Sequence, residues 1–316
     1  MLHHKEKSEG GEFLRQEDQF RSWVEKGGSS KFPIASGRYH LYVSLACPWA
    51  HRTIIVRKLK KLENVIGMTV VDPIRDERGW GFTEKKDPIN GFEYLGQAYT
   101  SSDSSYEARV TVPVLWDIKT SQIVSNCDDD IMRMLNSTFD DFTDSNLDLY
   151  PVELRSEIDA INDLIYSNVN DGVYRSGFAK TQNAYEAAVH KLFKTLDLLE
   201  SRLSEHRYLT GNRLTEADWR LFPTLIRFDA VYHGHFKCNL KRIIDYPNLY
   251  GYMCDLYHHD GIAETVDFDH IKRHYYMTHP EINPTKIVPV GPSFKFDASH
   301  NRARLSNDNY TIGLRC

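Results

Sequence analysis

The fold of this chain depends on the stretch Arg38-Tyr-His-Leu-Tyr-Val-Ser-Leu-Ala-Cys-Pro-Trp-Ala-His-Arg52. Its first half has apolar side chains at alternate positions, the period of a β-strand: Tyr39, Leu41 and Val43. Its second half places Pro48 directly after Cys47, and proline is favoured at the first position of a helix. We therefore expect a helix to begin beside Cys47 and to continue over residues 53–62, where apolar residues recur at helical spacing.

The elements predicted after this helix complete a small sheet. Residues 65–71 are apolar nearly throughout, which predicts a second strand in the interior of the sheet. Two short apolar runs, residues 112–117 and 122–125, predict a hairpin, and a helix is expected over residues 128–136. Residues 72–108 show no periodicity and predict a long loop, a feature that is usually functional. The order strand–helix–strand followed by hairpin–helix is typical of a thioredoxin-like domain.

The rest of the chain is predicted to be helical. An acidic stretch over residues 137–150 marks a boundary, and Thr215 and Asp218 are spaced as the capping box of a later helix. Between them lies an apolar stripe at helical spacing, made of Val189, Leu192, Phe193, Leu196, Leu199 and Leu203. The predicted fold class is α/β plus all-α, an N-terminal thioredoxin-like domain with a C-terminal all-helical domain. The expected parts are a polar N-terminal arm over 1–35, the thioredoxin-like domain over 36–137, the helical domain over 150–276 and a C-terminal extension over 277–316.

The composition argues against several functional classes. The 316 residues carry 39 basic and 44 acidic side chains, a net charge of −5, which argues against a nucleic-acid partner. No stretch reaches the roughly 18–20 apolar residues that cross a bilayer, and the N-terminus lacks the apolar core of a secretory signal, so no membrane partner is expected. The five cysteines show neither disulfide-framework nor metal-ligand spacing. We therefore expect free thiols, no metal and a cytoplasmic location.

Cys47 is the candidate nucleophile. The partial positive charge at the start of a helix favours a thiolate, which is the reactive form of cysteine. Ala50 stands where a dithiol motif has its second cysteine, so the thiol is expected to exchange with an external small thiol such as glutathione. Val112-Pro113 precedes a strand, where a cis proline facing the cysteine is expected. The alternative interpretation of a lone cysteine is a buried, inert thiol.

Several motifs together resemble one family. They are Ser44-Leu-Ala-Cys-Pro-Trp-Ala-His-Arg52, Thr111-Val-Pro-Val-Leu-Trp-Asp117, Leu214-Thr-Glu-Ala-Asp218, Arg227-Phe-Asp229, His235-Phe-Lys-Cys-Asn239, His274-Tyr-Tyr276 and Ile282-Asn-Pro284. Over roughly residues 10–292 the chain resembles the Xi class of glutathione transferases, the glutathionyl-hydroquinone reductases. The resemblance implies the glutathione transferase fold, a homodimer and glutathione as co-substrate.

The resemblance also implies a reaction and the residues that perform it. Cys47 is expected to attack the sulfur of a glutathionyl-hydroquinone, release the hydroquinone and keep glutathione as a disulfide that a second glutathione resolves. The positions that hold glutathione are matched by Trp80, Arg109 and Val112, the last through its main chain. The positions that line the hydroquinone pocket are matched by Tyr174 and by Tyr275 or Tyr276. Taken without the resemblance, each tyrosine is equally well explained by core packing.

The chain departs from the family pattern at one place. The family usually reads Asn-Glu-Ser-Ser where this chain has Asn126-Cys-Asp-Asp129, and Glu and Ser hold the γ-glutamyl end of glutathione. Asp128 can still pair with the ammonium of the ligand, but its charge is expected to repel the ligand's carboxylate. Cys127 places a second thiol at the rim of the pocket or acts as a neutral filler. This departure motivates an alternative function, a paralogue with weakened glutathione binding that senses redox state or binds quinones.

Overall fold

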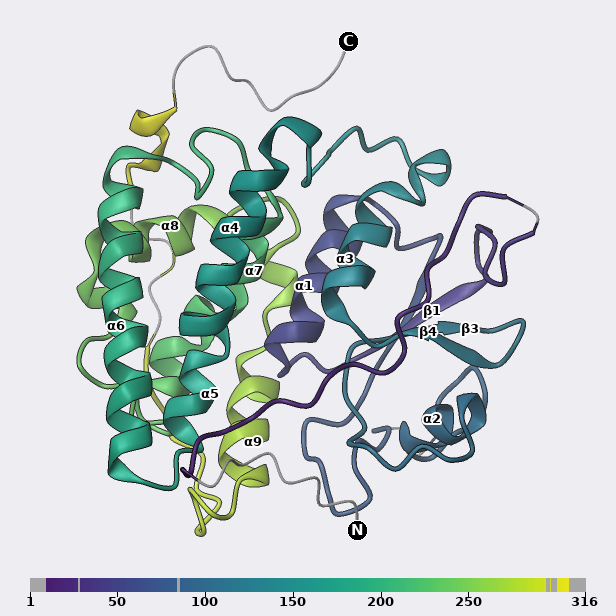
Figure 1. Ribbon diagram of the computed structural model, residues 1–316, viewed down its shortest axis with the longest axis horizontal. Helices are drawn as coiled ribbons and strands as arrows, with labels where there is room; N and C mark the ends of the chain where they lie inside the picture. The colour runs from purple at the N-terminus through teal and green to yellow at the C-terminus, as the bar shows by residue number, and fades with distance from the viewer. Residues whose placement is uncertain (1–9, 28, 84–85, 294–295, 297–299, 307–316) are drawn as a thin grey trace. The chain divides into compact units, whose positions relative to one another are not determined.

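The computed structural model describes residues 10–27, 29–83, 86–293, 296 and 300–306, and the chain forms two compact units. The first unit comprises Gln16–Leu147 and Glu264–Pro280. The second comprises residues 10–15, Asp148–Ala263 and the described residues from Glu281 onward. Figure 1 colours the chain by residue number, from purple near the N-terminus to yellow near the C-terminus. In the described residues, no helix combines the length and the apolar character that crossing a membrane requires.

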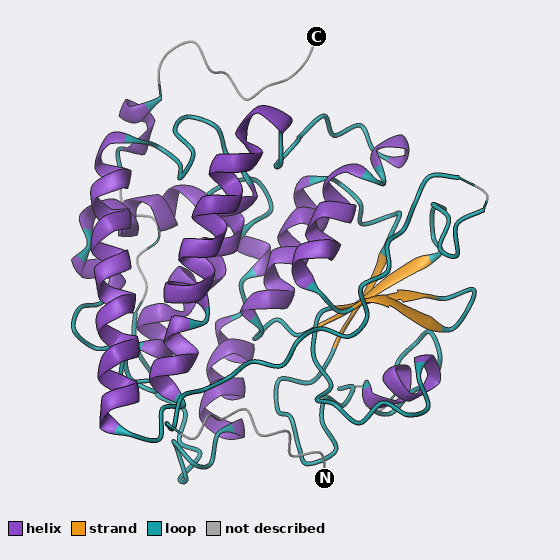
Figure 2. Cartoon of the chain, viewed as in Figure 1, coloured by secondary structure: helices purple, strands orange, loops and turns teal. Residues whose placement is uncertain are grey.

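The sheet of the first unit has the predicted strands (orange in Figure 2). They are β1 Tyr39–Val43, β2 Gly67–Val70, β3 Val114–Asp117 and β4 Gln122–Ser125. Their order is β2-β1-β3-β4, with β2 parallel to β1 and the other two pairs antiparallel. All five residues of β1 are buried, so the first predicted strand forms the middle of the sheet. This mixed sheet with a parallel β1–β2 pair and a β3–β4 hairpin confirms the thioredoxin-like domain.

The prediction that residues 65–71 form an interior strand is wrong. Strand β2 lies at the edge of the sheet, pairs with β1, and its four residues are all half-buried. The buried residues of this apolar run are Val65, Ile66 and Val71, which lie just outside the ladder. The apolar run therefore reflects burial at the two ends of the strand rather than burial on both of its faces.

Three helices pack around this sheet. Helices α1 Pro48–Leu59 and α3 Asp128–Ser137 lie side by side, and α2 Gly96–Ser102 lies across the sheet from them (Figure 1). Helix α2 falls in the segment 72–108 that was expected to be a loop. Its seven residues are too few to show a helical period, and Ala98 and Tyr99 are the two that are buried.

The second unit is helical, as predicted. Its helices are α4 Arg155–Ile165, α5 Gly172–Gly177, α6 Gln182–Glu205, α7 Glu216–Arg227 and α8 Pro247–Tyr257. Helix α7 is buried along its whole length and begins with the predicted capping box. The main-chain N–H of Thr215 donates to Asp218 at 2.8 Å, and the hydroxyl of Tyr252 donates to the other carboxylate oxygen at 2.7 Å.

Helix α9 Phe268–Thr278 belongs to the first unit, although the sequence placed residues up to 276 in the helical domain. Two hydrogen bonds hold this segment: His51 Nε2 lies 2.8 Å from the hydroxyl of Thr265, and His274 Nδ1 lies 2.7 Å from the carbonyl oxygen of Pro73. The expected arm is also divided, because residues 10–15 belong to the second unit and residues from Gln16 to the first. Residues 1–9 and much of the expected C-terminal extension, including Cys316, lie outside the described residues.

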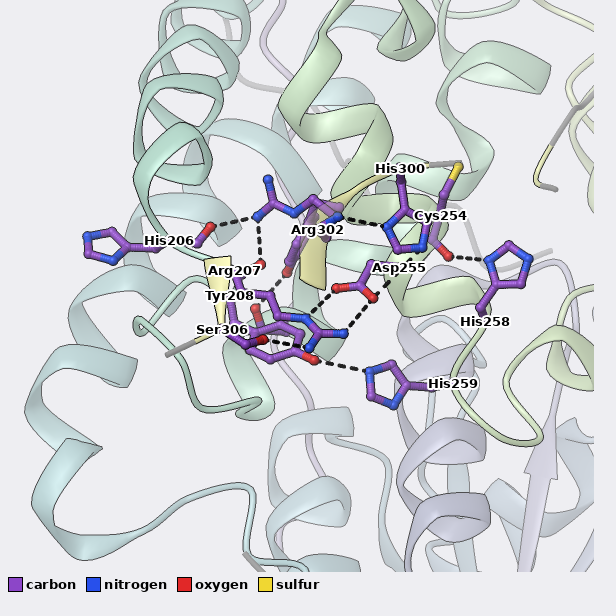
Figure 3. Close-up of polar contacts among 12 residues, drawn as sticks. His206, Arg207, Tyr208, Cys254, Asp255, His258, His259, His300, Arg302 and Ser306 are labelled. Carbon is purple, nitrogen blue, oxygen red and sulfur yellow. Dashed lines mark hydrogen bonds and ion pairs between the residues drawn. The ribbon is translucent and has the colours of Figure 1, made fainter. Parts of the chain in front are cut away.

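A buried arginine anchors the last described segment to the second unit (Figure 3). The Arg302 side chain donates to the carbonyl oxygens of Leu203, His206 and Arg207 at 2.6, 2.6 and 2.7 Å. These carbonyls end α6, where cationic side chains are favourable partners of the unpaired C=O groups. Arg207 in turn donates two hydrogen bonds, both of 2.9 Å, to Asp255 on α8.

Arg302→Ala is expected to lower the free energy of unfolding by about 2–4 kcal/mol, because it leaves three carbonyls, that of Leu203 fully buried, without a charged donor. Arg304→Ala is the matched control, since Arg304 is exposed in the same turn, and it should change the free energy by less than about 0.5 kcal/mol. Urea unfolding followed by circular dichroism measures both. Equal effects of the two substitutions would contradict the anchoring role of Arg302.

Candidate active site

Cys47 caps the N-terminus of α1. Its backbone is extended, with φ −76° and ψ 122°, and Pro48 occupies the first position of the helix. The main-chain N–H of Cys47 donates to the carbonyl of Ser44 at 3.1 Å, and the Cys47 carbonyl accepts from His51 at 3.0 Å. Cys47 is half-buried, and the first turn of α1 carries no acidic residue. Cys47 therefore lies at the positive end of a helix dipole whose first turn carries no carboxylate.

The segment that faces this thiol is the one predicted from the sequence. The Val112–Pro113 peptide bond is cis, and the thiol of Cys47 lies 3.5 Å from the carbonyl oxygen of Val112. Val112 is 5% exposed, whereas Cys47 retains partial exposure. This partial exposure does not fit the alternative of a deeply buried, inert thiol.

Arg109 is held three residues before Val112 by a residue of the N-terminal arm. The main-chain N–H of Arg109 donates to Gln16 Oε1 at 2.9 Å, and its carbonyl accepts from Gln16 Nε2 at 2.8 Å. The Tyr106 hydroxyl donates to the same carbonyl at 2.8 Å. Gln16 therefore fixes the main chain that leads to Val112, a role that the sequence did not indicate because Gln16 lies in a polar arm without periodicity.

Trp80 lies in the first unit against α9. Its ring stacks on that of His274 with centroids 5.0 Å apart and an interplanar angle of 18°, and the Arg75 guanidinium lies 5.6 Å from the Trp80 ring. The ring of Tyr275 lies edge-on to that of His274, with centroids 5.4 Å apart, and Tyr275 is 1% exposed. Tyr276 is half-buried, and burial raises the pKa of its hydroxyl. Of the two tyrosines matched to the hydroquinone pocket, Tyr276 is thus the more accessible.

Cys127 caps the N-terminus of α3 much as Cys47 caps α1. Its backbone is extended, and its main-chain N–H donates to the hydroxyl of Ser125 at 3.1 Å. Burial, with a further contribution from the neighbouring Asp128 carboxylate, raises the pKa of the Cys127 thiol to about 12. Cys127 is therefore a neutral thiol at physiological pH, which supports its interpretation as a filler.

Asp128, the first residue of α3, is paired with Arg52 from α1. The distance from Arg52 Nη1 to Asp128 Oδ2 is 2.7 Å, and the Arg52 side chain is 1% exposed. The Arg52 guanidinium also lies 4.5 Å from the ring of Trp49. The charge of Asp128 is therefore offset by a buried guanidinium, and the expected repulsion of the ligand's carboxylate stays a prediction.

Tyr174 belongs to the second unit, on α5, so its place beside the thiol stays a prediction. Within that unit its ring lies 5.4 Å from that of Phe236 and 4.8 Å from the guanidinium of Arg15. Arg15 in turn pairs with Asp171 at 2.9 Å.

The remaining described cysteines are buried thiols, as expected. Burial raises the pKa of Cys238 to about 12 and that of Cys254 to about 11. Both are therefore protonated at neutral pH. Over the part of the chain that the structure describes, no group of three or more His, Cys, Asp or Glu side chains is arranged to hold a metal ion.

Comparison with known proteins gives closely similar relatives over nearly the whole chain. A family model described as the glutathione S-transferase C-terminal domain matches residues 182–253. The chain is 52% identical to the glutathionyl-hydroquinone reductase PcpF of Sphingobium chlorophenolicum, over 91% of this chain and 92% of that protein. It is 50% identical to the glutathionyl-hydroquinone reductase YqjG of Escherichia coli, over 94% of each.

Solved structures agree with these sequence relatives. The glutathione-bound structure of Escherichia coli YqjG superposes with a TM-score of 0.87 over 90% of this chain and 96% of that chain, at 50% identity. The Xi-class glutathione transferase of Natrialba magadii gives a TM-score of 0.88 over 90% and 89% of the two chains, at 49% identity.

The environments of the cysteines predict selective alkylation. In the native protein Cys47 should react with iodoacetamide, whereas Cys127, Cys238 and Cys254 should be protected because they are buried and protonated. Peptide mass spectrometry after short exposures measures the four rates, and the unfolded protein gives the unprotected reference. Labelling of Cys127 as fast as that of Cys47 would contradict this prediction.

Proposed function

The chain belongs to the Xi class of glutathione transferases, the family of the glutathionyl-hydroquinone reductases, and we propose that it removes glutathione from glutathionyl-hydroquinones through a cysteine–glutathione disulfide. The observation that carries this proposal is the position of Cys47. Its thiol is partly exposed at the start of α1, 3.5 Å from the carbonyl of Val112, and Ala50 stands one turn later. A single thiol so placed forms a mixed disulfide and needs an external thiol to release it.

The chemistry follows from thiol–disulfide exchange. The Cys47 thiolate attacks the glutathionyl sulfur, so an S–S bond forms while the bond between that sulfur and the ring carbon breaks. The electron pair of the broken bond stays on the ring carbon, which takes up a proton to give the free hydroquinone. A second glutathione thiolate then attacks the mixed disulfide and releases oxidised glutathione and the Cys47 thiolate. The ring carbon is thereby reduced by two electrons, which come from the thioether sulfur of the substrate's glutathionyl group and from the thiol of the second glutathione; both sulfurs leave as oxidised glutathione.

The glutathionyl group is proposed to bind along the segment that faces Cys47. The main chain of Val112, next to the cis proline, offers a partner for the cysteinyl part of the ligand. Trp80 and Arg109 contribute to the same site, and Asp128 faces the ammonium of the γ-glutamyl group. The arm residue Gln16 supports this site by holding both main-chain polar groups of Arg109.

The hydroquinone is proposed to lie against tyrosines. Tyr276 is half-buried on α9 in the same unit as Cys47, while Tyr275 is nearly fully buried and supports His274. The resemblance also matches Tyr174, on α5, to a position that lines the hydroquinone pocket in the family, where a tyrosine hydroxyl would hydrogen-bond a phenol. A homodimer and a cytoplasmic location are part of the same proposal; free thiols such as those of this chain persist in reducing compartments.

The alternative of a glutathione-weakened paralogue was motivated by the departure at Cys127, Asp128 and Asp129. Arg52 lies 2.7 Å from Asp128 and offsets its charge, which weakens the main argument for a redox-sensing or quinone-binding role. The reductase is therefore the function that the site supports best.

Cys47→Ser is expected to lower the turnover of a glutathionyl-hydroquinone by at least about 10³-fold, because the nucleophile and the mixed disulfide are both lost. Cys254→Ala, at a buried cysteine of the second unit, serves as the matched control and should keep wild-type turnover. Liquid chromatography of the released hydroquinone measures the rate. In parallel, treatment with oxidised glutathione should add one glutathione to Cys47, read by peptide mass spectrometry. Wild-type protein without turnover, or an adduct on another cysteine, would refute the proposal.

A further inference from the structure

Two helices of the first unit begin in the same way but carry different charges. Helix α1 follows Cys47 and has no acidic residue in its first turn, whereas α3 follows Cys127 and begins with Asp128, Asp129 and Asp130. The N-terminus of a helix is favourable for an anion. Three carboxylates at the start of α3 already interact with the positive end of the helix, and they repel a further carboxylate.

Two arginines from distant parts of the chain offset these carboxylates. Arg21, in the arm, donates two hydrogen bonds of 2.7 Å to Asp130. Arg52, on α1, lies 2.7 Å from Asp128 and 3.7 Å from Asp129. Two guanidinium groups therefore face three carboxylates, and the start of α3 is far less negative than its sequence suggests.

The two arginines differ in how firmly they are held. The Arg21 side chain is 58% exposed, so water screens its interaction with Asp130. The Arg52 side chain is 1% exposed and packs on the ring of Trp49 at 4.5 Å. A buried cation needs its counter-ion, and a planar guanidinium orients the carboxylate that it binds. Arg52 therefore fixes Asp128, whose side chain is 15% exposed at the helix start.

We propose that Arg52 is a positioning residue for the γ-glutamyl group of glutathione. By holding Asp128 and offsetting its charge, Arg52 allows the start of α3 to accept the carboxylate of that group while Asp128 faces its ammonium. Arg52 acts through Asp128 and does not touch the reacting sulfur atoms. This inference rests on the proposed function, in which the glutathionyl group binds beside Cys47 with its γ-glutamyl end at the start of α3.

A calorimetric titration with S-methylglutathione tests this inference without turnover. Arg52→Gln should raise the Kd about tenfold, which corresponds to about 1.4 kcal/mol, because Asp128 then repels the ligand's carboxylate. The double substitution Arg52→Gln with Asp128→Asn removes both charges but keeps an amide oxygen that can accept from the ligand's ammonium, so it should return the Kd to within about threefold of wild type. Arg52→Lys, which keeps the charge but not the planar fork, should fall between wild type and Arg52→Gln.

A matched control uses the other arginine of the same helix start. Arg21→Gln should change the Kd less than about threefold, because Arg21 is exposed and pairs with Asp130 rather than Asp128. In turnover of a glutathionyl-hydroquinone, Arg52→Gln should raise KM about tenfold and leave kcat within about twofold, because it affects binding rather than the sulfur chemistry. If Arg52 had a purely structural role, Arg52→Gln would lower the amount of folded protein but would not raise KM at a nearly constant kcat.

Three results would overturn the inference. They are wild-type affinity in Arg52→Gln, an equal loss of affinity in Arg21→Gln, or a double variant that binds as weakly as the single one. If Arg52→Gln does not fold, the double variant and Arg52→Lys still test the inference. A Kd more than about tenfold above wild type in the double variant would refute a role of Arg52 through the charge of Asp128. Wild-type protein that binds S-methylglutathione but does not turn over the substrate would refute the proposed function and leave this inference standing.

Discussion

The position of Cys47 at the positive end of α1, a helix whose first turn has no acidic residue, is the constraint on which the site depends. The buried central strand β1 fixes where α1 begins, and the hydrogen bond from Cys47 to Ser44 closes the short turn between them. Cys127 caps α3 in a similar extended conformation but in different surroundings. There burial and three following aspartates raise the pKa of the thiol to about 12. Two cysteines at similar helix starts thus differ in their burial and in the number of carboxylates in the helical turn that follows.

Most of the first unit was predictable because its elements are local. The strand β1, the hairpin of β3 and β4, and helix α3 each carry their period within ten or fewer consecutive residues. Helix α2 was not predictable because seven residues with two buried side chains show no period. The edge position of β2 was not predictable because it depends on which strands pair, and an apolar run looks the same at the edge and in the middle.

The site was predictable to the extent that its chemistry lies in contiguous motifs. Cys47 and the cis Val112–Pro113 bond follow from short segments, and the structure brings them together. The supporting contacts join residues far apart in sequence: 93 residues separate Gln16 from Arg109, and 201 separate Pro73 from His274. No local pattern marks such pairs. They also explain why α9 belongs to the unit that carries the thiol.

The aspartates of α3 satisfy two requirements that oppose each other. Negative charge in the first turn stabilises a helix through its dipole, but the same charge repels an anionic ligand at that helix end. Buried Arg52 and exposed Arg21 resolve this conflict by pairing with Asp128 and Asp130. Because Arg52 lies on the helix that Cys47 begins, the pairing also joins the start of the thiol helix to the start of the helix proposed to receive the far end of the ligand. Any change of charge at Asp128 must therefore be judged together with Arg52, and not from the sequence around α3 alone.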